Sequence, residues 1–340
     1  MSLLAVTNLC VDFAGQEGTV HAVDHVSFSV EPGELVGLVG ESGCGKSITA
    51  LSILGLVSMM SNQSSQGRVE FEGRNLLGLP EREVRKVRGK DIAMIFQDPV
   101  TSLDPVLSIE RQMNEGIEIH IGLSHAEATK RSVEMLQLVG IPGATERIKD
   151  FPHQLSGGMR QRVMIAMALS CNPRLLLADE PTTALDVTIQ AQILRLMKQL
   201  SRDCNAAVIM ITHDLGVVAG MCERIMVMYA GRIVEMGPAS ELFRHPHHPY
   251  TIGLLRSVPR LDEPRVAELP SIEGLPPDLA HLPPGCGFAP RCSFVTDECW
   301  HEVPALQPTT SERRSACLHV AEFVKSPPSR RSGEAQEEGS

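Results

Sequence analysis

The sequence predicts an α/β fold, a sheet whose strands are joined by helical crossovers, and two observations lead to it. Short apolar runs such as ELVGLVG and RLLLAD alternate with longer amphipathic runs such as VTIQAQILRLMKQLS. A glycine-rich stretch, GESGCGKS, stands between ELVGLVG and the helical run SITALSILGL. The 340-residue chain is 43% hydrophobic, enough for a large core. Its net charge of −10 argues against nucleic acid as the main partner.

The elements of the first half follow in order. Residues 1–120 contain the β-rich runs VSFSV, ELVGLVG, GRVEFEG and IAMIFQ. Residues 106–145 are predicted to be helical. Ser124 and Glu127 match a capping box, in which each satisfies a backbone donor at the start of a helix. An apolar face then runs to Gly140, which is a stop signal.

The second half alternates again and then changes character. Residues 155–260 are predicted to run through a helix, the strand RLLLAD, a helix, the strand AAVIMIT and another helix. RIMVMYAGRIVEMG then predicts a hairpin that turns at Gly231. Prolines become dense after residue 260, and residues 323–340 are expected to form a disordered tail.

The glycine-rich stretch, residues 40–47, matches the phosphate-binding pattern G-x-x-x-x-G-K-[ST] in the strand-to-helix context that the pattern requires. Its glycines let backbone N–H groups face a phosphate chain, and the helix N-terminus adds partial positive charge. The lysine is expected to reach the β- and γ-phosphates, and the serine hydroxyl to bind Mg²⁺. The cysteine in the loop occupies a nonspecific position, where we expect a bystander open to alkylation. The expected nucleotide ligands are Gly40, Glu41, Ser42, Gly43, Cys44, Gly45, Lys46 and Ser47.

A pair of carboxylates completes this predicted site. Asp179 and Glu180 end the apolar strand LLLADE, and ligands of open α/β sheets lie beyond the carboxyl ends of strands. Asp179 is expected to hold Mg²⁺ through water. Glu180 is then free to orient and deprotonate a water molecule, as a general base does.

Further motifs carry a family resemblance. LSGGM at residues 155–159, followed by RQRVMIAMAL, resembles the signature motif of the ATP-binding cassette (ABC) ATPases. FQDP, ALD and THD resemble the Q-, D- and H-loops of that family, and they contain Gln97, Asp186 and His213. The resemblance implies that His213 contacts the γ-phosphate and that Gln97 senses both Mg²⁺ and the membrane partner. No guanine-specifying N-K-x-D follows, which tells against a GTPase.

The resemblance also implies a head-to-tail dimer. Ser156, Gly157 and Gly158 precede a helix and form a second backbone anion site, which meets the ATP of the other subunit. The aromatic residue that stacks on adenine in the family has no clear counterpart. The corresponding region, EGTVHAVD, offers Val20 and His21, and Phe13 lies further upstream.

Four of the nine cysteines fall in the last quarter of the chain. Around them, HPHHPYTIGLLRSVPR and SIEGLPPDLAHLPPGCGFAPRC resemble the C-terminal extension of the dipeptide and oligopeptide importer ATPases. That resemblance implies a 4Fe–4S cluster on four thiolates. The residues alone leave a cluster, a tetrahedral zinc and free thiols open, although the paired spacing of zinc knuckles is missing. The candidate ligands are Cys286, Cys292, Cys299 and Cys317.

The implied organisation is an ABC ATPase domain at 1–258 with a helical subdomain at about 98–160, a cysteine-bearing extension at 259–322, and the tail. We expect the cassette to have its own core, so that ATP binding does not depend on the extension. The implied partners are a second ATPase, favouring a heterodimer, two transmembrane permeases and, indirectly, an extracytoplasmic peptide-binding protein. The chain would then sit on the cytoplasmic face of the inner membrane.

Three other functions remain open. A related importer for nickel or a glycoside is the nearest one. A soluble ABC protein of DNA repair or translation usually carries a second cassette or a long coiled coil, and neither is found here. An Fe–S redox protein is disfavoured because the hydrolysis motifs are complete.

Overall fold

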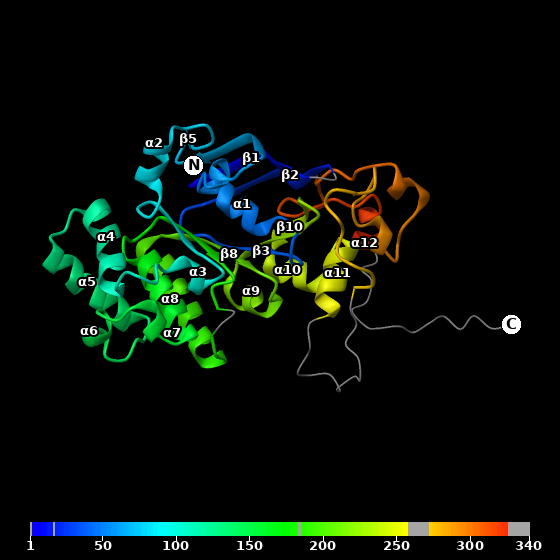
Figure 1. The fold of residues 1–340 in the computed structure, drawn as a ribbon. Helices are drawn as coiled ribbons and strands as arrows, with labels where there is room; N and C mark the ends of the chain where they lie inside the picture. The colour runs from blue at the N-terminus through cyan, green and yellow to red at the C-terminus, as the bar shows by residue number, and fades with distance from the viewer. Residues whose placement is uncertain (1, 16–17, 183–184, 258–271, 326–340) are drawn as a thin grey trace.

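The computed structural model describes residues 2–15, 18–182, 185–257 and 272–325. Two sheets lie one above the other with α1 between them (Figure 1). The core sheet agrees with the α/β prediction in its parallel strands β9, β3, β8, β7 and β6, and it is mixed because the remaining strands add antiparallel pairs at one edge. Its strands in spatial order are β11 (Gln307–Pro308), β12 (Arg314–Ser315), β10 (Arg232–Pro238), β9 (Arg224–Tyr229), β3 (Leu35–Val39), β8 (Ala207–Thr212), β7 (Leu175–Asp179) and β6 (Ile92–Ile95).

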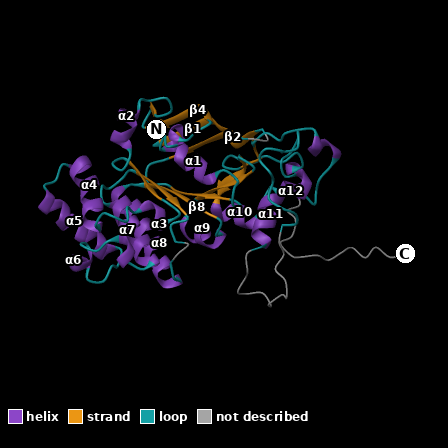
Figure 2. Cartoon of the chain, viewed as in Figure 1, coloured by secondary structure: helices purple, strands orange, loops and turns teal. Residues whose placement is uncertain are grey.

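The second sheet is antiparallel and covers the phosphate-loop helix. Its strands in order are β2 (Thr19–Val30), β1 (Leu4–Ala14), β4 (Gln63–Phe71) and β5 (Arg74–Asn75). Figure 2 shows these strands as a separate layer from the core sheet. The β-rich runs of the first 75 residues therefore divide between two sheets. Only β3 among them joins the parallel core.

The helices group around the two faces of the core sheet and at one side of it (Figures 1 and 2). The α-helices are α1 (Lys46–Ile53), α2 (Glu81–Val87), α3 (Pro99–Ser102), α4 (Ile109–Ile121), α5 (His125–Leu138), α6 (Ala144–Arg147), α7 (Gly157–Leu169), α8 (Val187–Cys204), α9 (Leu215–Met221), α10 (Ala239–Arg244), α11 (Pro249–Arg256) and α12 (Val320–Lys325). Short 3-10 helices are η1 (Val57–Met59), η2 (Pro152–Gln154), η3 (Ala289–Arg291) and η4 (Asp297–Trp300). None of the helices that the structure describes is long and apolar enough to traverse a bilayer.

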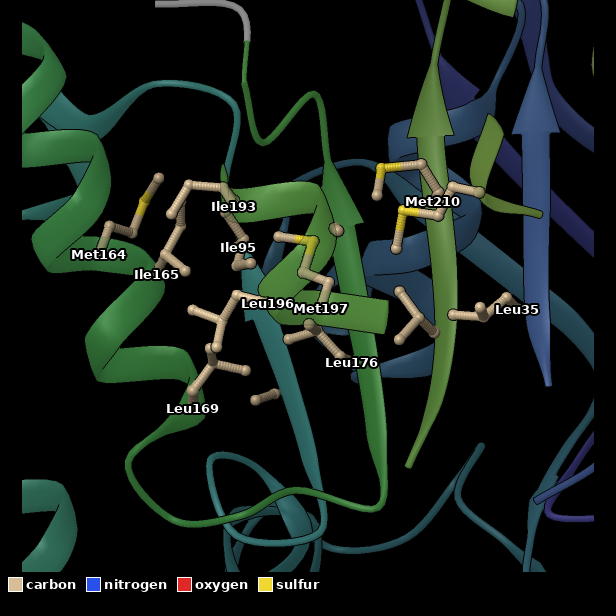
Figure 3. Close-up of a cluster of buried hydrophobic side chains, with 14 of the residues drawn as sticks. Leu35, Ile95, Met164, Ile165, Leu169, Leu176, Ile193, Leu196, Met197 and Met210 are labelled. Atoms are coloured by element: carbon tan, nitrogen blue, oxygen red, sulfur yellow. The ribbon is translucent and has the colours of Figure 1, made fainter. Parts of the chain in front are cut away.

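Buried strands of the core sheet serve two cores at once. Along β8, Val208 and Met210 point into one apolar cluster, and Ala207, Ile209 and Ile211 point into the other. This alternation is the period-2 geometry of a strand. Figure 3 shows the first cluster, where Leu35, Leu176 and Met210 of the sheet meet helical side chains such as Ile165 and Met197. Burial on both faces explains the continuous apolar runs in the sequence.

Two local predictions are confirmed. The capping box of Ser124 and Glu127 is present at the start of α5. The hairpin of β9 and β10 turns at Ala230 and Gly231, whose φ angles are +48° and +79°. Positive φ at both turn residues is the pattern whose twist matches the flanking strands.

The described part of the extension packs on the core of the cassette, because β12 pairs with β10 and Phe288 is buried in the first apolar cluster. That the cassette binds ATP without the extension stays a prediction. One expected boundary is wrong. The expected tail began at residue 323, but α12 continues to Lys325 and buries Phe323, whose ring lies 5.1 Å from that of Phe294. The rest of the expected tail, residues 326–340, and residues 258–271 lie outside the described part of the chain.

Candidate functional site

The phosphate loop is wrapped tightly against neighbouring backbone. A Cβ at Gly45 would lie 2.3 Å from the carbonyl oxygen of Ala22, and one at Gly40 would lie 2.2 Å from that of Met228. Any side chain at either position would clash, so both sites require glycine. Lys46 is buried, and its ammonium donates to the carbonyl oxygens of Gly40 at 2.8 Å and Glu41 at 2.7 Å. The loop therefore fixes the cation that is expected to meet the phosphates.

A cavity of about 140 Å³ opens at this loop, between β3, β7 and the β1–β2 hairpin. Asp179 is buried at its wall and is hydrogen-bonded to Ser47, so the two expected Mg²⁺ ligands are in contact. Burial raises the pKa of Asp179, and the Ser47 hydrogen bond works in the opposite direction. An Mg²⁺ ion fits this donor set, because it prefers carboxylate, hydroxyl and water oxygens. The cavity is lined by Ala22, Ser42, Gly43, Gly45, Lys46, Ser47, Ile48, Gln97, Asp179 and Glu180.

Two residues predicted from separate motifs, Gln97 and His213, converge on the carboxylate of Glu180. Glu180 accepts from Gln97 Nε2 at 3.1 Å through one oxygen, and its other oxygen lies 2.8 Å from Nδ1 of His213. Glu180 also has a φ of +45°, an unusual conformation for a non-glycine residue at the end of a strand. Such strain is found at functional sites more often than elsewhere. The arrangement holds a carboxylate beside the phosphate loop, with an amide and an imidazole fixing its orientation.

The remaining predicted ligands lie apart from this cavity. Ser156 caps the N-terminus of α7, where its hydroxyl accepts from the backbone of Met159 at 3.3 Å. Asp186 caps α8 in the same way and accepts from Ile189 at 3.0 Å. Both caps are exposed, and neither they nor Gly157 and Gly158 belong to the described lining of the phosphate-loop cavity.

Two side chains of the loop point away from the cavity. Cys44 is 6% exposed and packs in the second apolar cluster, and burial raises the pKa of its thiol. The expectation that it is open to alkylation is therefore wrong, since the thiolate is the reactive form. The carboxylate of Glu41 pairs instead with Arg291, a residue of the extension that no motif had indicated.

The hairpin that packs on the loop carries an aromatic ring, although the sequence left the adenine contact without a residue. Phe13 pairs directly with Val20 across the β1–β2 hairpin. The same hairpin packs its Ala22 backbone on Gly45 of the loop. Because directly paired residues share a face of a sheet, Phe13 and Val20 lie on one face of this hairpin, and both are half-buried. The pairing register, which the sequence alone did not provide, identifies this ring.

The four clustered cysteines gather around one small space. A cavity of about 20 Å³ is lined by all four, together with Phe288, Phe294 and His319 among other residues. Burial raises the pKa of Cys292 to about 11 and that of Cys317 to about 12. Nε2 of His319 lies 3.6 Å from the sulfur of Cys299. The structure thus brings together Cys286, Cys292, Cys299 and Cys317.

The spacing of these sulfurs tests which metal group suits them. All four cysteines are described, and no three of their sulfurs lie within 4.8 Å of one another. A tetrahedral zinc with bonds of about 2.3 Å requires sulfurs about 3.8 Å apart. A cluster of several irons holds its thiolates further apart than a single ion does. Four thiols around one cavity form a donor set that an iron–sulfur cluster can use.

Comparison with known proteins agrees with this architecture. Residues 23–183 match the ABC transporter family, and residues 234–299 match the C-terminal region of oligopeptide and dipeptide transporters. The chain is 52% identical over 320 residues to the oligopeptide transport ATP-binding protein OppD of Salmonella typhimurium, covering 94% of each chain. It is 54% identical over 290 residues to the dipeptide transport ATP-binding protein DppD of Bacillus subtilis, covering 85% of this chain and 86% of that one.

A solved structure shows the same fold. The dimeric ATP-binding cassette MJ0796, bound to ADP and Pi in a post-hydrolysis state, matches with a TM-score of 0.62 and 28% identity. The match covers 69% of this chain and 98% of that cassette, so the cysteine-bearing part lies largely beyond it. From the length and identity of these matches, the chain belongs to the ATP-binding subunits of the oligopeptide/dipeptide family of ABC transporters.

Proposed function

We propose that this chain hydrolyses ATP to drive the uptake of dipeptides or oligopeptides, and that it does so as one of two cassettes in a head-to-tail pair. The observation that carries the catalytic part is the position of Glu180, which is held by Gln97 and His213 at the wall of the phosphate-loop cavity. The peptide substrate rests on the match of residues 234–299 and on the names of the relatives.

The residues of the cavity divide the work between binding and proton transfer. Lys46 and the loop backbone would hold the β- and γ-phosphates, and Ser47, Asp179 and Gln97 would hold Mg²⁺. That ion would neutralise charge on the phosphate oxygens. Glu180 orients a water molecule and takes its proton, which is general-base catalysis. His213 holds Glu180 and would contact the γ-phosphate, as the family resemblance implies.

The base of the adenine would stack on Phe13, since this ring lies on the hairpin that covers the phosphate loop. Stacking of a base on an aromatic ring contributes about 1–3 kcal/mol.

A second chain is needed to complete the site in this proposal. Ser156, Gly157 and Gly158 present the N-terminus of α7, a helix of 13 residues, away from the cavity of their own chain. Backbone donors at a helix start bind anions well. In a head-to-tail pair they would meet the γ-phosphate held by the partner, and Asp186 would lie near the same interface. The dimeric form of the cassette MJ0796 is consistent with this arrangement.

A variant at the signature motif tests the pair. In protein carrying Glu180→Gln to stop hydrolysis, ATP should convert monomers to dimers, or drive pairing with the second ATPase if the natural pair is a heterodimer. Adding Ser156→Arg should leave ATP binding by the monomer intact but block that conversion, because the side chain fills the anion site. Size-exclusion chromatography with and without ATP measures this. Dimers that form equally well with Ser156→Arg would refute the shared site.

We also propose that the four cysteines hold a 4Fe–4S cluster that orders the extension. The gathering of the four thiols around one cavity supports a cluster, and the surrounding chain has little regular structure to hold it in place. Anaerobically purified protein should be brown and contain about four irons per chain. If the protein contains one zinc and no iron, the four cysteines form a zinc site instead of a cluster. If the extension is fully folded without any metal, neither metal site exists.

In the cell this subunit would work with a second ATPase, two permeases and an external peptide-binding protein, at the cytoplasmic face of the inner membrane. Co-purification of tagged chain with two multi-span proteins from solubilised membranes would support this placement. Growth on a peptide as sole source of a required amino acid, compared between parent and Glu180→Gln strains, tests the substrate class. If the Glu180→Gln strain instead loses uptake of nickel or of a glycoside, the transported solute is that compound, and the assignment of the chain as the ATPase is unchanged.

A further inference from the structure

The second residue of the phosphate loop is tied to the cysteine-bearing extension. Glu41 forms a two-pronged ion pair with Arg291, with Nη1–Oε2 and Nη2–Oε1 distances of 2.6 and 2.9 Å. The Arg291 side chain is 5% exposed and that of Glu41 is 24% exposed. Bidentate pairs of this kind are the strongest and most directional contacts between an arginine and a carboxylate. The two residues are 250 positions apart in the sequence.

Both partners of this pair are themselves held in place. Nε of Arg291 donates to the carbonyl oxygen of Glu273 at 3.0 Å, and its guanidinium carbon lies 5.9 Å from the centre of the Tyr229 ring. On the other side, the backbone N–H of Glu41 donates to the hydroxyl of Tyr250 at 2.8 Å. The rings of Tyr229 and Tyr250 pack on Phe288 of the extension, at 5.2 and 5.4 Å between centres.

This pair bears on nucleotide binding through both charge and shape. A carboxylate in the phosphate loop repels a polyphosphate unless a cation neutralises it. Glu41 also offers its carbonyl oxygen to the ammonium of Lys46 at 2.7 Å, so its backbone position helps to set that of the lysine. Removing Arg291 would leave the Glu41 carboxylate without its counter-charge and the start of the phosphate loop without this anchor.

We infer that Arg291 is a positioning residue of the nucleotide site, through which the extension sets the affinity of the cassette for nucleotide. Arg291 neutralises Glu41 and anchors the start of the phosphate loop, without touching the nucleotide itself. This inference rests on the nucleotide site proposed above. It also gives the extension a role inside the ATPase, because Arg291 immediately precedes Cys292 in the chain.

The test is the affinity of the full chain for Mg·ADP, measured by calorimetry, since ADP does not require the closed pair. Arg291→Met should weaken binding about tenfold, because the phosphate loop then carries an uncompensated carboxylate and loses an anchor at its start. Arg291→Lys keeps the charge but not the two-pronged geometry, and should lose less. If Arg291→Met fails to fold, Arg291→Lys carries the test, with at least a threefold loss expected.

A matched control is available at the other end of the same sheet. Arg224 forms a similar two-pronged pair with Glu34, at 2.7 and 3.1 Å, beside the start of β3 rather than its phosphate-loop end. Arg224→Met should therefore change Mg·ADP affinity less than threefold. Equal losses in Arg224→Met and Arg291→Met would mean that general loosening is the cause, and would overturn the inference.

The decisive variant removes both charges of the pair. Glu41→Gln combined with Arg291→Met should bind Mg·ADP about threefold more tightly than Arg291→Met alone and about threefold more weakly than the parent, because the lone carboxylate is gone but the anchor is still missing. A purely structural role for Arg291 predicts no such recovery. An affinity of Arg291→Met within threefold of the parent, or no recovery in the double variant, would refute the inference. Lys46→Ala tests the proposed nucleotide site separately from the role of Arg291. If this variant still binds Mg·ADP normally, the proposed nucleotide site itself is wrong.

Discussion

The nucleotide site and the cysteine-bearing extension are built by different means. The catalytic residues of the first follow the ends of neighbouring parallel strands, so Lys46, Glu180 and His213 meet because β3, β7 and β8 lie side by side. In residues 272–325, the described part of the extension, there are two-residue strands, two 3-10 helices and one short helix. Its order rests on buried rings, ion pairs and the proposed metal group. A site built on the strands of a sheet keeps its structure when one side chain is removed, whereas a segment held by few contacts can lose its structure.

The largest expected effect is confined to the nucleotide side. Glu180→Gln should bind ATP but lose turnover by about 10²–10⁴-fold, because an amide cannot accept the proton from water. The fold should be unaffected, since Gln keeps the size of the side chain and can still bond to Gln97 and His213. Steady-state phosphate release measures the loss. The metal content and the protease pattern of the extension should match those of the parent. The variant would then change the nucleotide site without changing the extension.

If Glu180→Gln still hydrolyses ATP at a near-normal rate, Glu180 is not the general base, and another group in the cavity must take the proton. The matched comparison is Glu34→Gln, a carboxylate at the opposite end of β3 that pairs with Arg224. This change should leave turnover within about threefold of the parent.

The next effect begins in the extension and reaches the nucleotide site. Cys292→Ser should lose the brown colour and bound iron, because a hydroxyl is a much poorer ligand than a thiolate. Without the cluster, residues 272–319 should become sensitive to limited proteolysis. Mg·ADP affinity should fall about threefold, less than in Arg291→Met, since loosening of Cys292 affects its neighbour Arg291 only indirectly.

Cys204→Ser is the control for this experiment, because Cys204 is an exposed thiol at the end of α8. It should keep iron, protease resistance and nucleotide affinity. If Cys292→Ser loses its iron while Mg·ADP affinity and proteolysis stay unchanged, the cluster would not order the extension and the two regions would be independent.

The sequence predicted the nucleotide site far better than it predicted the contact between the two regions. Phosphate-loop ligands and the carboxylate pair have fixed residue types at fixed distances from strands and helices, so a linear pattern identifies them. Glu41 and Arg291 carry no such pattern. Each is an ordinary charged residue within its own segment, and only folding brings them together across 250 positions.

Other differences have the same origin. Phe323 was assigned to a disordered tail because its neighbours are polar and proline-rich, and it is ordered by a ring far from it in the sequence, Phe294. Phe13 was left aside because the register of β1 on β2, with its bulges, is not visible in a linear reading. Cys44 is hidden because the loop turns its thiol into the core.

The smallest effect concerns a histidine that joins the cassette to the extension. His248 is 2% exposed, and its Nδ1 accepts from the backbone N–H of Tyr250 at 3.1 Å at the start of α11. The ring also bonds to the backbone of Ala316, next to β12. Burial lowers the pKa of His248 to about 4, whereas an unfolded histidine has a pKa of about 6.5.

The sign of the pH effect follows from these two values. Below about pH 6.5, His248 becomes protonated in the unfolded chain, whereas in the folded chain it stays neutral until about pH 4. Because the unfolded state binds the extra proton, the free energy of unfolding decreases as the pH falls through this range. Between about pH 7 and pH 5 the loss from this one group is about 2 kcal/mol. His248→Asn keeps an oxygen acceptor at the cap of α11 but has no titrating ring. It should be less stable than the parent at neutral pH, and the gap should narrow by about 2 kcal/mol at pH 5.

Trp300 makes this measurable, because it is the single tryptophan of the chain and lies in η4 of the extension. Urea titrations followed by its fluorescence at about pH 7, 6 and 5 would report unfolding of this region. His247, whose pKa is also lowered to about 4, is present in both proteins and cancels in the comparison. Parallel pH profiles for parent and His248→Asn would show that His248 is protonated without cost in the folded chain, and that the junction between cassette and extension opens more easily than its burial implies.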